Sequence, residues 1–229
     1  SEAIDMSDAN LIVVTGATGQ LGRHVVEQLL AKVPANRIVA AVRDPQKAAD
    51  FAKRGVQVRK ADYSQPETLD AAFAGAEKVL LISANEIGKR AVQHQAVIDA
   101  AKRANVKLLA YTSILHADTS NLFLALEHQQ TETAIKASGL PFVFLRNGWY
   151  NENYTETLHP VIAHGVLAGS SGQGKIAAAD RADYAAAAVV VLTENGHANK
   201  VYELAGDSAF TKAELAAEVA KQTGKAVKH

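Results

Sequence analysis

Apolar residues follow two alternating patterns along this chain. Short unbroken apolar runs are typical of strands buried on both faces, and they alternate with segments whose apolar residues recur at helical spacing. The predicted strands are residues 11–15, 37–42, 56–60, 78–82, 106–112, 141–145 and 200–204. The predicted helices are residues 20–33, 45–53, a segment beginning at 64–67, 88–104, 121–138, 181–192 and 211–223, with a loop over 165–174. This alternation predicts an α/β fold with a doubly wound parallel sheet, because parallel strands need helical crossovers.

A glycine-rich turn follows the first predicted strand. Gly16, Gly19 and Gly22 stand three residues apart, and the helical pattern begins at once. Strand, glycine turn and helix open a Rossmann dinucleotide-binding unit, whose phosphates bind free N–H groups at the helix N-terminus. We predict that Gly16 forms the tight turn, that Gly19 admits the pyrophosphate, and that Gly22 lets the helix approach the strand. The spacing is G-x-x-G-x-x-G and not G-x-G-x-x-G, so a turn that binds nothing remains an alternative.

The end of the second predicted strand distinguishes NAD from NADP. An acidic residue there accepts the ribose 2′-hydroxyl, whereas an arginine accommodates a 2′-phosphate. The strand is followed by Arg43, Asp44 and Pro45. Arg43 is the first polar residue after the apolar run, which favours NADP(H). Asp44 precedes a proline and fits a helix N-cap, although a shift of one residue would make it the acid of an NAD site.

Composition excludes several classes of function. The chain has 229 residues with 24 basic and 24 acidic side chains, so a nucleic-acid partner is not expected. No apolar run reaches the roughly 18 residues of a membrane span, and no cysteine is present for a disulfide or thiolate site. The only methionine, Met6, suggests that the natural start lies there and that residues 1–9 are added or disordered. We expect a cytoplasmic protein.

No set of catalytic side chains emerges from the spacing. None of the six tyrosines has a lysine four residues later, so the Tyr-Lys dyad of short-chain dehydrogenases is missing. The eight histidines form no H-E-x-x-H motif, and no G-x-S-x-G elbow exists, so neither a metal site nor a serine hydrolase is expected. Asp183 is expected to complement the dipole of a helix beginning at Arg181, with a cofactor or substrate role as the alternative.

Several segments together resemble one family. The chain is similar to the NmrA-like branch of atypical short-chain dehydrogenases, and within it to bacterial NADPH-dependent quinone oxidoreductases, near the triphenylmethane reductases. The similarity covers about residues 10–228, and members of this branch continue further at the C-terminal end. The segments that carry it are residues 15–22 (TGATGQLG), 42–45 (VRDP), 81–85 (LISAN), 110–113 (AYTS), 111–120 (YTSILHADTS) and 145–153 (LRNGWYNEN).

The resemblance implies a role for each part of the cofactor site. The residues implied are Gly16, Ala17, Thr18, Gly19, Gln20 and Leu21 for the pyrophosphate, Arg43 for the 2′-phosphate, Ser83, Ala84 and Asn85 for the adenosine and ribose, and Asn147, Gly148, Trp149 and Tyr150 for the nicotinamide. All of these segments follow predicted strands, where open α/β sheets bind their ligands. For Trp149 and Tyr150, two ordinary aromatic residues at a domain boundary remain the alternative.

The resemblance also implies a domain organisation and an activity. Residues 10–150 would form the NADP-binding Rossmann domain, and residues 151–229 part of a smaller substrate lobe interleaved with it, truncated at its end. The implied reaction is hydride transfer from NADPH to a small-molecule quinone without a catalytic dyad. The alternative, also known among NmrA-like proteins, is a non-catalytic NADP(H)-binding redox sensor that regulates a partner protein. The protein would be a monomer or a homodimer.

Overall fold

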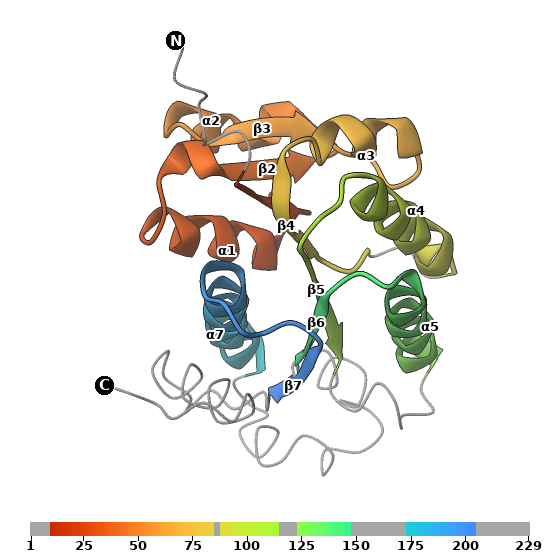
Figure 1. The fold of residues 1–229 in the computed structure, drawn as a ribbon. Helices are drawn as coiled ribbons and strands as arrows, with labels where there is room; N and C mark the ends of the chain where they lie inside the picture. Colours follow the sequence, from red (N-terminus) through yellow and green to blue (C-terminus); the bar gives the residue numbers. More distant parts are fainter. Residues whose placement is uncertain (1–9, 85–87, 115–122, 148–172, 205–229) are drawn as a thin grey trace.

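One parallel sheet, covered by helices on both faces, organises the molecule (Figure 1). The computed structural model describes residues 10–84, 88–114, 123–147 and 173–204. The strands are β1 (Leu11–Thr15), β2 (Ile38–Val42), β3 (Gln57–Lys60), β4 (Ala76–Leu81), β5 (Leu108–Ile114), β6 (Phe142–Asn147) and β7 (Lys200–Leu204). The helices are α1 (Gln20–Leu30), α2 (Ala49–Lys53), α3 (Pro66–Ala72), α4 (Arg90–Arg103), α5 (Phe123–Ser138) and α7 (Gln173–Thr193), with short 3-10 helices η2 (Ala35–Arg37) and η3 (Pro45–Ala48).

The strand order is β3-β2-β1-β4-β5-β6-β7, and every neighbouring pair is parallel. The chain runs outward from β1 to β3, returns to β4 beside β1, and then runs outward in the other direction. This is the Rossmann order continued by one strand, and its topological switch point lies between β1 and β4. The predicted doubly wound parallel sheet is therefore confirmed.

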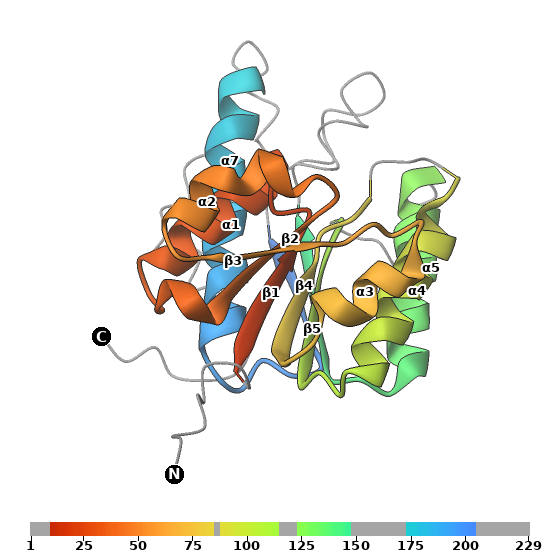
Figure 2. The same cartoon turned by 90° about the horizontal axis from the view of Figure 1, so that it is seen from above.

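The strands are apolar because both sheet faces are covered. All five residues of β1 and all five of β2 are buried, whereas the edge strand β3 is only partly buried. Alternate side chains of β1 point to opposite faces: Ile12 and Val14 join the core with α1 and α7, and Leu11 and Val13 join the core with α3, α4 and α5. Figure 2 shows the two helical layers on either side of the sheet. Among the described helices, none is long and apolar enough to cross a membrane.

The start of α7 corrects one sequence prediction. The helix was expected over 181–192, after a loop ending at 174, but it begins at Gln173. Alanines at 177–179 have the highest helix propensity of any residue, and they continue the helix across the polar residues that suggested a start. Asp183 therefore lies inside α7, away from the free N–H groups at its N-terminus, so the predicted dipole role is wrong. The predicted helix at 211–223 and the rest of the predicted loop lie outside the described residues.

Candidate functional site

The glycine turn after β1 has a shape that only glycine permits at two of its positions. Gly16 has a φ of +58°, in the left-handed region that side chains disfavour. A Cβ added to Gly22 would lie 2.1 Å from the carbonyl oxygen of Gly16, an impossible contact. Gly22 therefore lets the first turn of α1 lie directly against the backbone of Gly16 and Ala17, which follow β1.

The N-terminus of α1 presents backbone donors to solvent. Gly19 is the N-cap, with no side-chain hydrogen bond, and the first turn carries no acidic residue. The N–H of Arg23 is the first to bond back into the helix, to the carbonyl of Gly19 at 2.9 Å, so the N–H groups of residues 20–22 precede the intrahelical ladder. Gly16, Gly19 and Gln20 are exposed, while Ala17 and Leu21 are buried and support the turn from beneath. This arrangement suits an anion such as a pyrophosphate.

A hydroxyl bridge joins β1 to β4 at the switch point. The Thr15 hydroxyl donates to the carbonyl of Leu80 at 2.9 Å and accepts the N–H of Ile82 at 3.0 Å. Tyr63, which the sequence analysis did not single out, adds its hydroxyl at 2.7 Å from Thr15 Oγ1 and 3.1 Å from the carbonyl of Ile82. The carboxyl ends of β1 and β4 are thus fixed relative to each other beside the glycine turn.

The residues after β2 separate into two roles. Arg43 is exposed at the carboxyl end of the strand. The Asp44 side chain accepts the N–H of Gln46 at 3.1 Å and caps η3, which confirms its predicted N-cap role. A carboxylate used as a cap is already satisfied by that N–H group. The two residues therefore differ in the structure: Asp44 caps a helix, and Arg43 is exposed beyond the strand.

Asp62, at the end of β3, adds negative charge near Arg43. Hydrogen bonds from the hydroxyl and N–H of Ser64 hold the pKa of Asp62 below its ordinary value of 3.8, and the charge of Arg43 contributes to the shift. The positive charge of Arg43 thus helps to keep the Asp62 carboxylate ionised.

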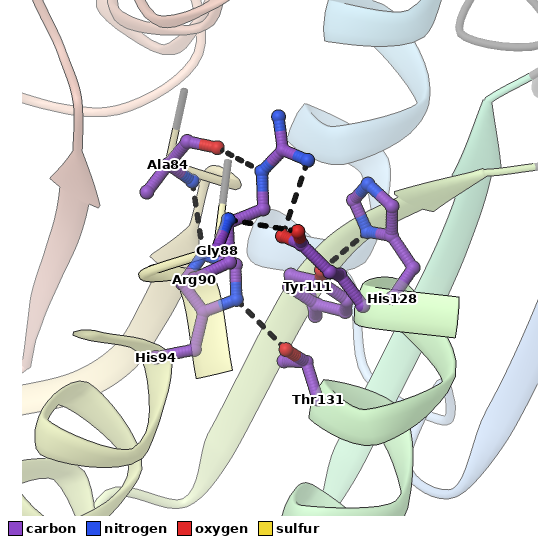
Figure 3. Close-up of polar contacts among 8 residues, drawn as sticks. Ala84, Gly88, Arg90, His94, Tyr111, His128 and Thr131 are labelled. Carbon is purple, nitrogen blue, oxygen red and sulfur yellow. Dashed lines mark hydrogen bonds and ion pairs between the residues drawn. The ribbon is translucent and has the colours of Figure 1, made fainter. Parts of the chain in front are cut away.

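The backbone just beyond β4 is held by side chains from two helices (Figure 3). Nε2 of His94, on α4, accepts the N–H of Ala84 at 2.9 Å, and Nε of Arg90 donates to the Ala84 carbonyl at 2.5 Å. Oε1 of Glu127, on α5, accepts the N–H of Gly88 at 2.9 Å. Sequence spacing gave no signal for this network, because its members come from separate helices and meet only in the folded chain.

Two histidines in this region are buried and neutral. Burial and, to a smaller extent, the charge of Arg90 lower the pKa of His94 to about 3. Burial, Arg90 and His94 together lower the pKa of His128 to about 3. Nδ1 of His128 lies 2.5 Å from the hydroxyl of Tyr111 on β5. These histidines are locally bonded. Among the described residues, no group of three or more His, Cys, Asp or Glu side chains could hold a metal ion.

A second polar network lies at the carboxyl ends of β5, β6 and β7. Arg146 forms a buried ion pair with Glu132 at 2.7 Å and a second pair with Glu203 at 2.9 Å. The Ser113 hydroxyl donates to Glu132 at 2.6 Å, so the serine at the end of β5 is bound to a carboxylate. The next residue after Arg146, Asn147, is buried, and its Oδ1 has no hydrogen-bond partner among the residues that the structure describes. A buried unpaired acceptor is costly, and a ligand donor would satisfy it.

The sequence-predicted site residues that the structure describes lie along one edge of the sheet. The glycine turn follows β1, Arg43 follows β2, Ser83 and Ala84 follow β4, and Asn147 ends β6. Because the strands are parallel, these carboxyl ends share an edge that spans the switch point. Asn85, Gly148, Trp149 and Tyr150 lie outside the described residues.

Comparisons with known proteins agree with this geometry. Residues 16–195 match the family model described as NAD(P)H-binding. The chain is 57% identical to quinone oxidoreductase 2 of Escherichia coli, over 95% of this chain and 76% of that protein. It is also 32% identical to an NmrA-like family domain-containing oxidoreductase of Aspergillus flavus, over 94% of this chain and 72% of the relative.

A solved structure supports the same assignment. The E. coli NADPH-dependent quinone oxidoreductase complexed with NADPH superposes with a TM-score of 0.72 at 50% identity, covering 94% of this chain and 76% of that one. Most of the chain, including the glycine turn, matches the family model, and the resemblance drawn from the motifs is confirmed by these relatives. The chain therefore belongs to the NAD(P)H-binding family.

Proposed function

We propose that this protein is an NADPH-dependent reductase that transfers hydride to quinones. The observation that carries the proposal is the 57% identity to E. coli quinone oxidoreductase 2 over 95% of the chain. The described residues fit the cofactor: the glycine turn leaves room and donors for a pyrophosphate, and Asn147 Oδ1 lacks a partner. In this proposal residues 16–21 hold the pyrophosphate and Arg43 the 2′-phosphate. Ser83, Ala84 and Asn85 line the adenosine and ribose side, and residues 147–150 flank the nicotinamide.

The reaction needs little acid–base chemistry from the chain. Hydride for the quinone comes from the reduced nicotinamide when the cofactor is bound. The reduced quinone oxygen carries a stable anion, so water can supply its proton, and the protein mainly orients the reactants and excludes solvent. The Ser113 hydroxyl already donates its proton to the Glu132 carboxylate. This contact supports a site in which the serine hydroxyl does not act as the general acid.

The proposal is tested by mixing the protein with NADPH and a simple benzoquinone and following the loss of reduced nicotinamide absorbance. We expect oxidation that depends on both the protein and the quinone. If the protein binds NADPH tightly but none of the quinones tested causes NADPH oxidation, the protein would instead be a redox sensor. A site without the dyad also permits that alternative. Catalytic turnover with a quinone is the result that separates the two functions.

Arg43→Glu is expected to weaken NADPH binding by roughly a hundredfold while changing NADH binding much less. The variant removes a charge-assisted contact and places a carboxylate against the 2′-phosphate, a change on the order of 3 kcal/mol. Titration calorimetry with both cofactors measures the difference. Lys53→Glu makes the same charge change at the last residue of α2, which precedes the amino end of β3, and should change the binding of neither cofactor. Equal weakening of both cofactors by Arg43→Glu would remove Arg43 as the discriminator.

Gly19→Val is expected to abolish cofactor binding while the protein remains folded. Gly19 has a φ of −73°, which any residue adopts, and its added Cβ would meet only the Gly16 carbonyl at 3.3 Å. The side chain would then occupy the space left for the pyrophosphate. Gly22→Ala, whose Cβ clashes with the same carbonyl at 2.1 Å, should lose stability as well as binding. Calorimetric titration with NADPH and thermal melting of both variants check the contrast, and NADPH binding by Gly19→Val would contradict the assignment.

Tyr150→Phe tests the absence of a catalytic acid. If solvent supplies the proton, kcat at saturating NADPH and quinone should stay within about tenfold, because a lost hydrogen bond of ~1 kcal/mol is worth less than a decade in rate. A general acid contributes roughly 10²–10⁴-fold. A fall of kcat beyond about a hundredfold, with unchanged NADPH affinity, would identify Tyr150 as that acid.

A further inference from the structure

Three hydrogen bonds fix the two backbone positions on either side of residues 85–87. The N–H and carbonyl of Ala84 are both bound, by His94 and Arg90, and the N–H of Gly88 is bound by Glu127. His94, Arg90 and Glu127 are at least nine-tenths buried. Figure 3 shows the side chains of His94 and Arg90 converging on Ala84. The backbone at Ala84 and Gly88 is therefore held by side chains of α4 and α5.

The protonation of His94 is defined by its two partners. Nε2 faces a backbone N–H and must accept, so the ring carries its proton on Nδ1. Nδ1 lies 2.8 Å from the hydroxyl of Thr131 on α5 and donates to it. The N–H of Ala84 thus sets the tautomer of His94, the Thr131 hydroxyl accepts the Nδ1 proton, and these two contacts link α5 to the end of β4.

A gain in the stability of the fold does not explain why the Arg90–Glu127 ion pair is present. Arg90 and Glu127 pair at 3.3 Å, with side chains only 8% and 6% exposed. Burying two charges costs desolvation that their attraction often fails to exceed, and apolar residues of similar volume would pack α4 against α5 equally well. Apolar residues could not, however, bind the carbonyl of Ala84 and the N–H of Gly88, as Arg90 and Glu127 do. The retained polarity therefore points to the backbone that it holds.

The backbone that follows β4 lies beside the glycine turn, at the switch point between β1 and β4. The residue before it, Ser83, is held by its own N–H on the Thr112 hydroxyl at 3.1 Å. Ile82 lies 3.6 Å from where a Cβ of Gly16 would stand. Ligands of open α/β sheets cross the sheet edge between the two strands at this point.

We propose that His94, Arg90, Glu127 and Thr131 are positioning residues for NADP(H), which hold the backbone at Ala84 and at Gly88 in the arrangement that the bound cofactor meets. This inference rests on the proposed function, since it assigns these residues to the same cofactor site. They act through the backbone and touch no reacting atom. Their effect falls on cofactor affinity, while the rate of the chemical step at saturation stays as it is.

The test compares variants of the His94 contact. His94→Leu removes the acceptor for Ala84 and should raise the Kd for NADPH about tenfold, with a matching rise in the KM for NADPH and kcat within about twofold. His94→Gln places an amide oxygen where Nε2 accepts and should restore the Kd to within about twofold of the parent. Thr131→Val keeps the volume of the side chain but removes the acceptor of the His94 Nδ1 proton, which weakens the hold of His94 on Ala84 and should raise the Kd about threefold. It also carries the test if His94→Leu does not fold.

A matched control comes from another buried histidine. His197 bonds the Tyr202 hydroxyl at 2.7 Å in the segment before β7, at the opposite edge of the sheet. His197→Leu should destabilise the fold by an amount similar to His94→Leu and leave the Kd for NADPH within about twofold. Without any cofactor, amide exchange of Ala84 should accelerate in His94→Leu and not in His94→Gln or His197→Leu.

The outcomes separate this inference from the proposed function. A parent protein that does not bind NADPH overturns both. A parent that binds NADPH, with His94→Leu binding equally well, or with His94→Gln as weak as His94→Leu, overturns the positioning role alone. Equal weakening by His197→Leu would also overturn it, because the loss would then follow general stability.

Discussion

Acidification from about pH 7.5 to about pH 4.5 is expected to lower the free energy of unfolding by about 5 kcal/mol, because two buried histidines must gain protons on unfolding. His94 and His128 have pKa values of about 3 in the folded protein, against an ordinary value of 6.5. Between these values the unfolded chain binds protons that the folded chain does not. The stabilisation is therefore complete above about pH 6.5 and is lost progressively as the pH falls toward about 3.

The groups around these histidines do not offset the effect. His94 is faced by Arg90, Thr131, Tyr63 and Tyr111, none of which supplies negative charge. The pKa of Asp62 is lowered from 3.8, so its own contribution is present above about pH 3.8 and is lost only as the pH falls below that value. The histidines thus dominate the acid limb above about pH 4.

Urea unfolding at several pH values measures this dependence. The double variant His94→Gln and His128→Gln should be less stable than the parent at neutral pH, but its stability should change much less between about pH 6.5 and about pH 4.5. A parent whose stability is flat across this range would contradict the buried neutral assignment.

Glu132→Gln is expected to destabilise the protein by about 3 kcal/mol, because it leaves the buried Arg146 guanidinium without its main counter-charge. The pair is 2.7 Å apart with side chains 5% and 6% exposed. The second partner, Glu203, is 38% exposed and is better screened, so it compensates only in part. The Ser113 hydroxyl would also lose its carboxylate acceptor.

An exposed ion pair provides the matched control. Arg103 and Asp70 lie 2.8 Å apart with both side chains 54% exposed, so Asp70→Asn should change the free energy of unfolding by less than about 1 kcal/mol. Denaturant titration of both variants gives the comparison. If Glu132→Gln costs no more than Asp70→Asn, the buried pair contributes nothing beyond a surface contact. Replacing Glu132 and Arg146 together by Leu and Met should recover much of the loss.

Local sequence signals were sufficient where a feature depends on neighbours in the chain. The glycine turn and the cap formed by Asp44 each depend on a few consecutive residues, and the structure agrees with both. The parallel sheet followed from the alternation of strands and helices along the chain. The predicted start of α7 was wrong because polar residues inside a helix resemble the first residues of a helix. The alanines that precede them were not counted as helical. A boundary of this kind is decided by propensity summed over the whole segment.

The buried polar networks could not be predicted from the sequence. His94 and Thr131 are 37 residues apart and sit on two different helices. In the sequence they look like ordinary polar positions of exposed helix faces. Their role depends on α4 packing beside α5 over the end of β4, which no spacing rule encodes. The same holds for Glu132 and Arg146, which meet between α5 and β6.

The contact between α1 and α7 has a consequence for how the chain can be divided and made. The side chain of Gln28 donates to the carbonyl of Ala182, 154 residues later, and Val25, Val26 and Leu29 share a core with the apolar residues of α7. Helix α1, which begins at the glycine turn, is therefore covered by α7. A fragment ending at residue 150 would leave that apolar stripe facing water and β6 without its outer neighbour. During synthesis, the nucleotide-binding half would wait for residues near 190 to leave the ribosome before its own first helix could be buried.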